Sequence, residues 1–137
     1  MSEQHRWWYS FHLPWPPTTN TYYRQRHGRA ILSRRGREFK EMAAYELLLQ
    51  SKPPEIIQGP FRLELLLVPP DNRLRDLDNH CKALLDALVD GAVIADDCRG
   101  HLAQLQVTWS DRCCPGGYAE VAIGPVEGVD NDPETAD

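Results

Sequence analysis

Five apolar side chains between residues 77 and 88 recur at the spacing of one face of an α-helix. They are Leu77, Cys81, Leu84, Leu85 and Leu88. Residues three, four or seven positions apart lie on the same side of a helix, so this spacing forms one continuous apolar stripe. Gly91 follows the stripe and is placed to end the helix. The segment therefore predicts an amphipathic helix that packs on a core.

The other predicted elements are one more helix and several strands. Residues 6–13 are aromatic and extended in character and predict a first strand, and the prolines from Pro14 onward begin a loop. That loop leads to Ser33, the expected N-cap of a helix over residues 34–50. Residues 71–75 form a polar turn. Further strands are predicted at residues 61–68, 93–95, 102–109 and 118–123. The sum is an α+β fold with a mixed β-sheet and two main helices.

Length and composition are those of a single globular domain. The chain has 137 residues, of which 42% are hydrophobic and 26% are charged, so a packed core is expected. No apolar run approaches the roughly 18 residues that cross a bilayer, and no secretory signal is visible. We therefore expect a cytoplasmic protein without a membrane partner. We expect residues 1–124 to form the domain and residues 125–137 to be an acidic, disordered tail.

The net charge of −5 conceals a basic segment. Five of the 20 acidic residues lie within residues 127–137, so residues 1–126 hold 15 acidic and 15 basic groups. Between Arg24 and Lys40 there are seven basic residues and one acidic residue, Glu38, which gives a local charge of +6. Such a segment is suited to DNA phosphates; a solvated basic face without a partner is the alternative. The candidate DNA contacts in it are Arg24, Arg26, Arg34, Arg35 and Arg37.

Aromatic residues and cysteines permit two further interpretations each. Seven of the twelve aromatic residues lie in the first 23 positions, where they either stack on unpaired bases or, as we expect, form core or subunit interface. The cysteines form no CxxC pair, and disulfides are not expected in a reducing compartment. A zinc site that uses Cys81, Cys98, His101 and either Cys113 or Cys114 fits no common ligand spacing, so we expect buried, free cysteines.

Aspartates lie around the start of the helix that the apolar stripe of residues 77–88 predicts. Asp76 and Asp78 open this helix, Lys82 follows Asp78 by one turn, and Asp96-Asp97 come after a glycine turn that returns the chain. Carboxylates, water and phosphate oxygens are the usual ligands of Mg²⁺, and a bound ion and a lysine both favour phosphodiester hydrolysis. In the alternative interpretation Asp76 is a helix cap, Asp78 and Lys82 form a surface pair, and Asp96-Asp97 is a turn.

Three stretches of the chain resemble the RusA family of Holliday-junction resolvases. They are LPWPPTTNTYY at residues 13–23, RDLDN at residues 75–79 with Lys82, and Asp86-Ala87-Leu88 with Asp96-Asp97. The likeness spans residues 9–123. It implies a Mg²⁺-dependent endonuclease that nicks four-way DNA junctions in recombination and repair, and that forms an entwined homodimer. Residues before Tyr9, the pair His80-Cys81 and the tail after Gly124 depart from the family pattern.

The resemblance also implies which residues act. Asp76, Asp78 and Asp97 correspond to the essential carboxylates that bind Mg²⁺, with Mn²⁺ as the alternative ion, and Lys82 corresponds to the essential lysine. A homodimer suits a two-fold symmetric junction because resolution takes two symmetric cuts. Arg73 and Arg75 either meet the phosphates of the cut strand or balance the local negative charge.

The sequence thus predicts a resolvase that acts on four-way or branched DNA. Two alternatives remain open. One is a catalytically inactive protein that binds junctions, and the other is a structural α+β dimer without nucleic acid. The acidic tail either covers the basic surface until DNA displaces it or is simply disordered.

Overall fold

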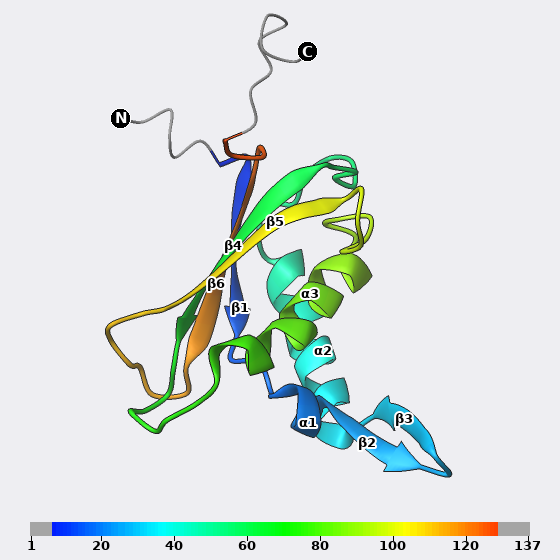
Figure 1. Ribbon diagram of the computed structural model, residues 1–137, viewed down its shortest axis with the longest axis vertical. Coiled ribbons are helices and arrows are strands. Elements are labelled where there is room, and N and C mark those ends of the chain that lie inside the picture. Colours follow the sequence, from blue (N-terminus) through cyan, green and yellow to red (C-terminus); the bar gives the residue numbers. More distant parts are fainter. Residues whose placement is uncertain (1–6, 129–137) are drawn as a thin grey trace, which may run out of the picture.

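The computed structural model describes residues 7–128 as a twisted sheet with its long helices on one side (Figure 1). The elements are β1 (Tyr9–Pro14), α1 (Thr19–Tyr22), β2 (Tyr23–Arg26), β3 (Arg29–Leu32), α2 (Arg34–Leu48), β4 (Phe61–Val68), the 3-10 helix η2 (Leu77–His80), α3 (Cys81–Asp90), β5 (Leu102–Trp109) and β6 (Tyr118–Gly124). The predicted α+β class and the two main helices are confirmed.

The main sheet has four strands in the order β1-β6-β4-β5. Strand β4 runs parallel to β5 and antiparallel to β6, and β6 runs antiparallel to β1, so the predicted mixed sheet is also confirmed. Strand β4 is central because its apolar run suits burial on both faces. Its crossover to β5 passes through η2 and α3. Pro14 ends the edge strand β1, where a missing backbone donor is tolerated.

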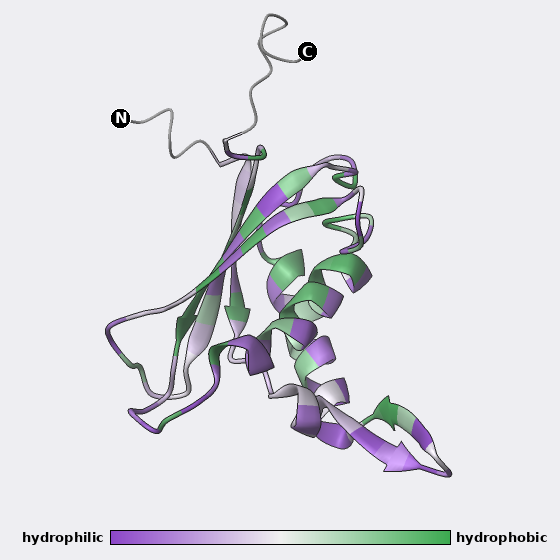
Figure 2. Cartoon of the chain, viewed as in Figure 1, coloured by the Kyte–Doolittle hydropathy of each residue, from purple (hydrophilic) through white to green (hydrophobic). Residues whose placement is uncertain are grey.

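The core lies between the sheet and the two long helices. Helix α2 buries Phe39, Ala43 and Leu47. From the stripe that predicted the second helix, Leu84, Leu85 and Leu88 are buried, while Leu77 and Cys81 are half-buried against the same cluster. Figure 2 shows the corresponding hydrophobic colouring on the helices and on the central strands. The apolar stripe therefore performs the packing that its spacing predicts.

The boundaries of the helices differ in part from the prediction. Ser33 caps α2 as expected, because its hydroxyl accepts a hydrogen bond from the Gly36 amide at 2.9 Å. Helix α2 ends at Leu48, before the predicted end at Gln50. The second helix starts as the 3-10 turn η2, and Asp76 occupies its N-cap position without a side-chain capping bond. Gly91 is the C-cap of α3, as predicted.

The long loop predicted between Pro14 and Ser33 is wrong. This segment contains α1 and the two-stranded hairpin β2–β3, which projects from the body of the molecule (Figure 1). His27 and Gly28 both have positive φ, 51° and 74°, as a tight two-residue hairpin turn requires. The predicted strand at residues 93–95 is also wrong, because only the single bridge between Ile57 and Ile94 forms there.

The cysteine prediction holds only in part. All four cysteines are free, but Cys98 and Cys113 are exposed and Cys81 and Cys114 are half-buried, so their predicted burial is wrong. None of the helices within residues 7–128 is long and apolar enough to cross a membrane. Most of the predicted tail lies outside the described residues. Glu127, near its start, exchanges two backbone hydrogen bonds with the side chain of Gln104.

Candidate active site and nucleic-acid interface

The segment that carries Asp76 and Asp78 is held in place by the aromatic residues of the N-terminal region. His80, only 2% exposed, lies with its Nδ1 3.1 Å from the Pro16 carbonyl oxygen, and its ring packs 4.8 Å from the Trp15 ring. Burial and the charge of Arg75 lower the pKa of His80, so the neutral ring donates its Nδ1–H to Pro16. Thr19 adds a weak bond to the Asn79 carbonyl. Both aspartates remain exposed on this anchored turn.

Asp97 lies on a second segment that is fixed by backbone pairing. Ile57 donates to Val93 at 3.0 Å and accepts from Ala95 at 2.9 Å. The next residues turn, and the Asp97 amide donates to the Asp96 carboxylate at 2.7 Å. This bond, followed by that from the Cys98 thiol, holds the pKa of Asp96 below its usual value. Asp97 is half-buried and Asp96 is exposed. Asp96 thus accepts its hydrogen bonds within its own turn.

Lys82 forms its ion pair with an aspartate other than Asp78. Its ammonium lies 3.3 Å from the carboxylate of Asp86, so the interpretation of Asp78 and Lys82 as a surface pair is wrong. Partial burial opposes the charged form of Lys82, but the Asp86 carboxylate, with smaller contributions from Tyr23 and Asp97, raises its pKa. Asp97 is therefore within electrostatic reach of Lys82. The lysine carries a full positive charge at neutral pH.

Tyr22 completes a buried network behind Lys82. Its hydroxyl donates to the second carboxylate oxygen of Asp86 at 3.1 Å, and its side chain is fully buried. Burial and the Asp86 charge raise the pKa of Tyr22 well above its ordinary value. Asp86 is thus bonded on both sides, by Tyr22 and by Lys82. This positioning role was not predicted from the sequence, although Asp86 follows Lys82 by one helical turn.

The structure pairs Lys82 with Asp86 and does not close the aspartates within residues 7–128 into one ligand set. Within residues 7–128, no three His, Cys, Asp or Glu side chains lie close enough together to hold a metal ion. The zinc site considered for Cys81, Cys98 and His101 is therefore not formed there. Exposed carboxylates of Asp76 and Asp78 do suit Mg²⁺, because this ion is usually held by one or two carboxylates and keeps several waters. The donor chemistry fits a hydrated magnesium ion.

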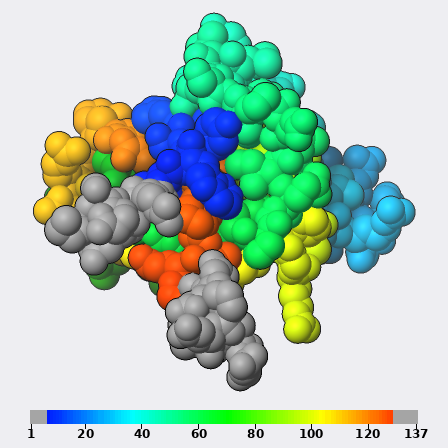
Figure 3. Space-filling model, turned by 90° about the horizontal axis from the view of Figure 1, so that it is seen from above, coloured from blue at the N-terminus to red at the C-terminus, as the bar shows by residue number. Residues whose placement is uncertain are grey.

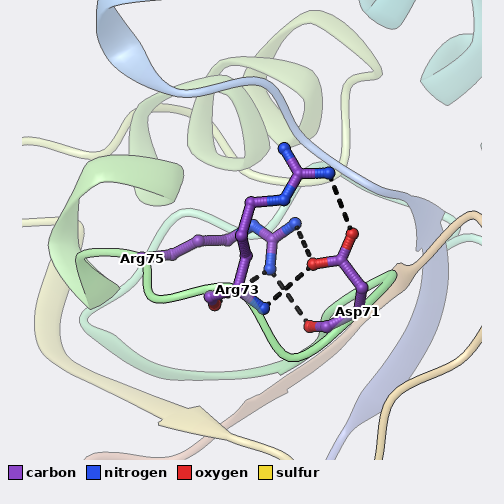
Figure 4. Close-up of polar contacts among 3 residues, drawn as sticks. All are labelled: Asp71, Arg73 and Arg75. Atoms are coloured by element: carbon purple, nitrogen blue, oxygen red, sulfur yellow. Dashed lines mark hydrogen bonds and ion pairs between the residues drawn. The ribbon is translucent and has the colours of Figure 1, made fainter.

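A braced loop precedes the aspartates (Figure 4). Asp71 accepts from the backbone and the side chain of Arg73, at 3.0 and 3.2 Å, and from the side chain of Arg75 at 2.8 Å. The bonds from Arg73 and Arg75 hold the pKa of Asp71 below its usual value. Arg75 also lies 5.7 Å over the Trp15 ring. Both arginines thus balance an acidic residue, but that residue is Asp71, which was not predicted from the sequence.

The basic residues of the predicted DNA-binding segment lie on the projecting hairpin and on the start of α2. Arg24, Arg26 and Arg29 are exposed on the hairpin, which stands out at the side of the body in Figure 3. Among the described residues, only Arg34 of the five predicted contacts in this segment forms an ion pair, with Glu38 at 3.3 Å. Arg37 donates to the Leu32 carbonyl. The hairpin is therefore an exposed positive surface.

Comparison with known proteins identifies the family. The family model described as "Endodeoxyribonuclease RusA" matches residues 14–116. The chain is 35% identical over 121 residues to the crossover junction endodeoxyribonuclease rusA of Enterobacteria phage HK97. These matched residues make up 88% of this chain and 98% of the phage protein. The chain is also 37% identical over 90 residues to the crossover junction endodeoxyribonuclease RusA of Escherichia coli strain K12. These matched residues make up 65% of this chain and 73% of the bacterial protein. This chain therefore belongs to the RusA endodeoxyribonuclease family.

Proposed function

We propose that this protein is a crossover junction endodeoxyribonuclease that resolves four-way DNA junctions by paired nicks. The observation that carries the proposal is the family match over residues 14–116, which contain every candidate catalytic residue. The 35% identical phage relative of that name is matched over 98% of its length. The match thus includes the two segments with the aspartates, the lysine between them and the arginine loop. The biological setting that we propose is DNA recombination and repair.

The proposed cofactor is Mg²⁺, with Mn²⁺ as the alternative ion. When bound, the ion supplies a hydroxide nucleophile and neutralises charge on the phosphate. Asp76 and Asp78 would hold it from the turn that opens η2. Asp97, on the segment that follows α3, does not join them in one ligand set in this structure and would act through a water bound to the ion. Lys82 stabilises negative charge on the phosphate, since its raised pKa keeps it positively charged. Asp86 and Tyr22 fix the position of the Lys82 ammonium without touching the substrate.

Arginine residues on two surfaces are proposed to hold the DNA. Arg73 and Arg75 lie three residues and one residue before Asp76 in the chain, so we expect them to contact the phosphates of the strand that is cut. We expect a junction arm to contact the basic residues of the hairpin and of the start of α2, which are Arg24, Arg26, Arg34, Arg35 and Arg37. A projecting positive hairpin can follow a phosphate backbone, and the resulting affinity falls as the salt concentration rises.

A homodimer is proposed as the active species. Two symmetric cuts need two active sites related by a two-fold axis, which an isologous dimer provides. Helix α2 and its C-cap expose a row of apolar side chains that a second copy would cover. They are Met42, Tyr45, Leu48 and Leu49, with exposed fractions of 53%, 62%, 73% and 66%. Contiguous apolar patches of this kind often mark interaction sites.

The test is cleavage of a synthetic four-way junction labelled on each strand in turn. Purified protein is incubated with the junction with and without Mg²⁺, beside a linear duplex of the same sequence. We expect paired nicks near the crossover that require Mg²⁺, and no cutting of the duplex. The Asp78→Asn variant should cut at least about 100-fold more slowly, because an amide is a poor replacement for a charged ligand.

Two other results would replace the proposal. Junction binding without any nicks, from folded protein and with either Mg²⁺ or Mn²⁺, would favour the catalytically inactive junction-binding protein. Neither binding nor cutting would return the aspartates to a structural role. Equal cutting by wild type and Asp78→Asn would move the metal site away from η2.

A further inference from the structure

The loop between β4 and η2 presents a leucine entirely to solvent. Leu74 is 99% exposed, more than any other large hydrophobic side chain within residues 7–128. A single exposed leucine is ordinary on a protein surface. Leu74 differs because of its position, two residues before Asp76 in the proposed catalytic site and between two arginines. The loop and the residues around Leu74 therefore bear on whether its exposed side chain contacts DNA.

The loop is braced rather than loosely attached. The Asp71 carboxylate accepts hydrogen bonds from Arg73 and Arg75, the two neighbours of Leu74. The Arg75 guanidinium also donates to two backbone carbonyl oxygens, those of Asp71 at 3.1 Å and of Arg73 at 3.2 Å. These bonds close a short ring of chain with the leucine at its outer side. An apolar side chain on such a support meets an approaching ligand with little loss of conformational entropy.

A pocket adjoins Leu74 on the same loop. Its volume is about 210 Å³, and its walls include Leu74, Arg73, Arg75, Pro69, Trp109 and Ser110. A cavity of about 150 Å³ is enough for benzene, so a single nucleobase ring is of suitable size. Trp109 offers an aromatic surface, Leu74 an apolar wall, and the arginines and Ser110 offer hydrogen-bond donors. Walls of this composition are typical of sites that hold an unstacked base.

We propose that Leu74 is a wedge that enters the base stack at the branch point, and that the adjoining pocket binds the displaced base. This inference rests on the proposed function. Proteins that distort DNA often insert a leucine or another apolar side chain between base steps. Bases at a branch point are the least costly to displace, because their stacking is already interrupted. The wedge would also select junctions over linear duplex.

A base fits this pocket better than a phosphate group. Both guanidiniums already share the Asp71 carboxylate, so their positive charge is partly balanced. The side chain of Leu74 offers no hydrogen bond to a phosphate oxygen, whereas Leu74 and the ring of Trp109 both offer apolar contact to a planar ring. The pocket thus supplements the phosphate contacts that we propose for the hairpin.

The experiment uses 2-aminopurine, a fluorescent base that brightens when it unstacks. It is placed at the crossover on the opposite strand, as the partner of the displaced base, so that the probe itself does not enter the pocket beside Trp109. Fluorescence and binding are measured without Mg²⁺, and cutting with Mg²⁺. We expect wild type to raise the fluorescence and Leu74→Ser to abolish the rise. On the fully paired junction Leu74→Ser should cut about tenfold more slowly, the effect of losing one favourable interaction in the transition state. A second junction with unpaired bases at the crossover should restore its rate.

Two control variants identify the cause. Leu74→Met keeps an apolar side chain of similar size and should behave as wild type. Leu105→Ser removes another leucine, 42% exposed in the middle of β5, and should leave fluorescence and cutting unchanged. If wild type nicks the junction and Leu74→Ser gives the same fluorescence rise and rate, the wedge is wrong and the proposed function stands. If wild type neither nicks the junction nor changes its fluorescence, the proposed function fails and the wedge with it.

Discussion

Individual side chains decide how the candidate site is charged. Lys82 has an aspartate one helical turn before it, Asp78, and another one turn after it, Asp86, so sequence spacing alone cannot choose its partner. The structure chooses Asp86 because Asp78 lies in the 3-10 turn, where side chains do not follow α-helical spacing. The candidate aspartates and Lys82 were predicted from sequence spacing and family resemblance, and their roles stay predictions. The Tyr22–Asp86–Lys82 network was not predicted. Tyr22 is 60 residues from Lys82 in the chain and reaches the network only through folding.

The raised pKa of Tyr22 predicts a stability effect at alkaline pH. In the folded protein Tyr22 stays protonated because of burial and the Asp86 charge, whereas in the unfolded chain it ionises near pH 10. Its contribution is therefore complete below about pH 10 and decreases as the pH rises beyond that value. Tyr22→Phe should lower the free energy of unfolding by about 1.5–3 kcal/mol at pH 7, the range for a hydrogen bond to a charged group. The difference from wild type should shrink above pH 10.

Urea denaturation of wild type and Tyr22→Phe between pH 7 and pH 11 measures this effect. Tyr9→Phe is the matched control, since it removes a hydroxyl outside the network. A difference between wild type and Tyr22→Phe that stays constant across this pH range would contradict the assignment.

At the scale of the elements, apolar pattern decided which ones could be predicted. The strands at residues 61–68 and 102–109 were predicted with their observed bounds, and the long helices followed from their stripes. The hairpin β2–β3 was missed because exposed arginines occupy positions where apolar alternation would reveal strands. Only His27-Gly28 gave a local signal for its turn. Apolar character can also mislead, because Met42, Leu48 and Leu49 are apolar and yet exposed rather than part of the core.

The hairpin holds two like charges in direct opposition. Arg26 pairs with Arg29 across the strands, an arrangement that destabilises a free hairpin. Replacing both by Gln should leave the free energy of unfolding unchanged or raise it by up to about 1 kcal/mol. The same change should weaken junction binding, and it should flatten the slope of log affinity against log salt concentration by about two, one for each phosphate that is no longer bound. Titrations with urea and with junction DNA at several salt concentrations measure these quantities.

Arg26→Lys with Arg29→Lys is the charge-preserving control, which should keep the salt slope of wild type. If the Gln variant binds with unchanged affinity and slope, the hairpin does not contact DNA, and the basic segment is a solvated face.

At the scale of the whole molecule, the exposed row on α2 is the feature that a single copy leaves unexplained. Tyr45 and Leu48 lie three residues apart on this helix, and neither belongs to the core. If α2 is the dimer interface, Tyr45→Ser with Leu48→Ser should convert the dimer to a monomer without unfolding it. Interfaces of stable complexes bury about 800 Å² on each partner, so the loss of two central side chains should weaken association by at least about tenfold. Analytical ultracentrifugation measures the change.

The same variant connects assembly with cutting. A monomer carries one active site, so nicks in the two strands of a junction should become independent, and singly nicked junctions should accumulate where wild type gives paired cuts. Leu105→Ser, an exposed leucine on β5, is the control and should remain dimeric with paired cuts. A double variant that still sediments as a dimer would place the interface on another face. The wild-type protein could also be monomeric at all concentrations and still make paired cuts. That result would remove the free homodimer from the proposal, because two copies would then need to assemble only on the junction itself.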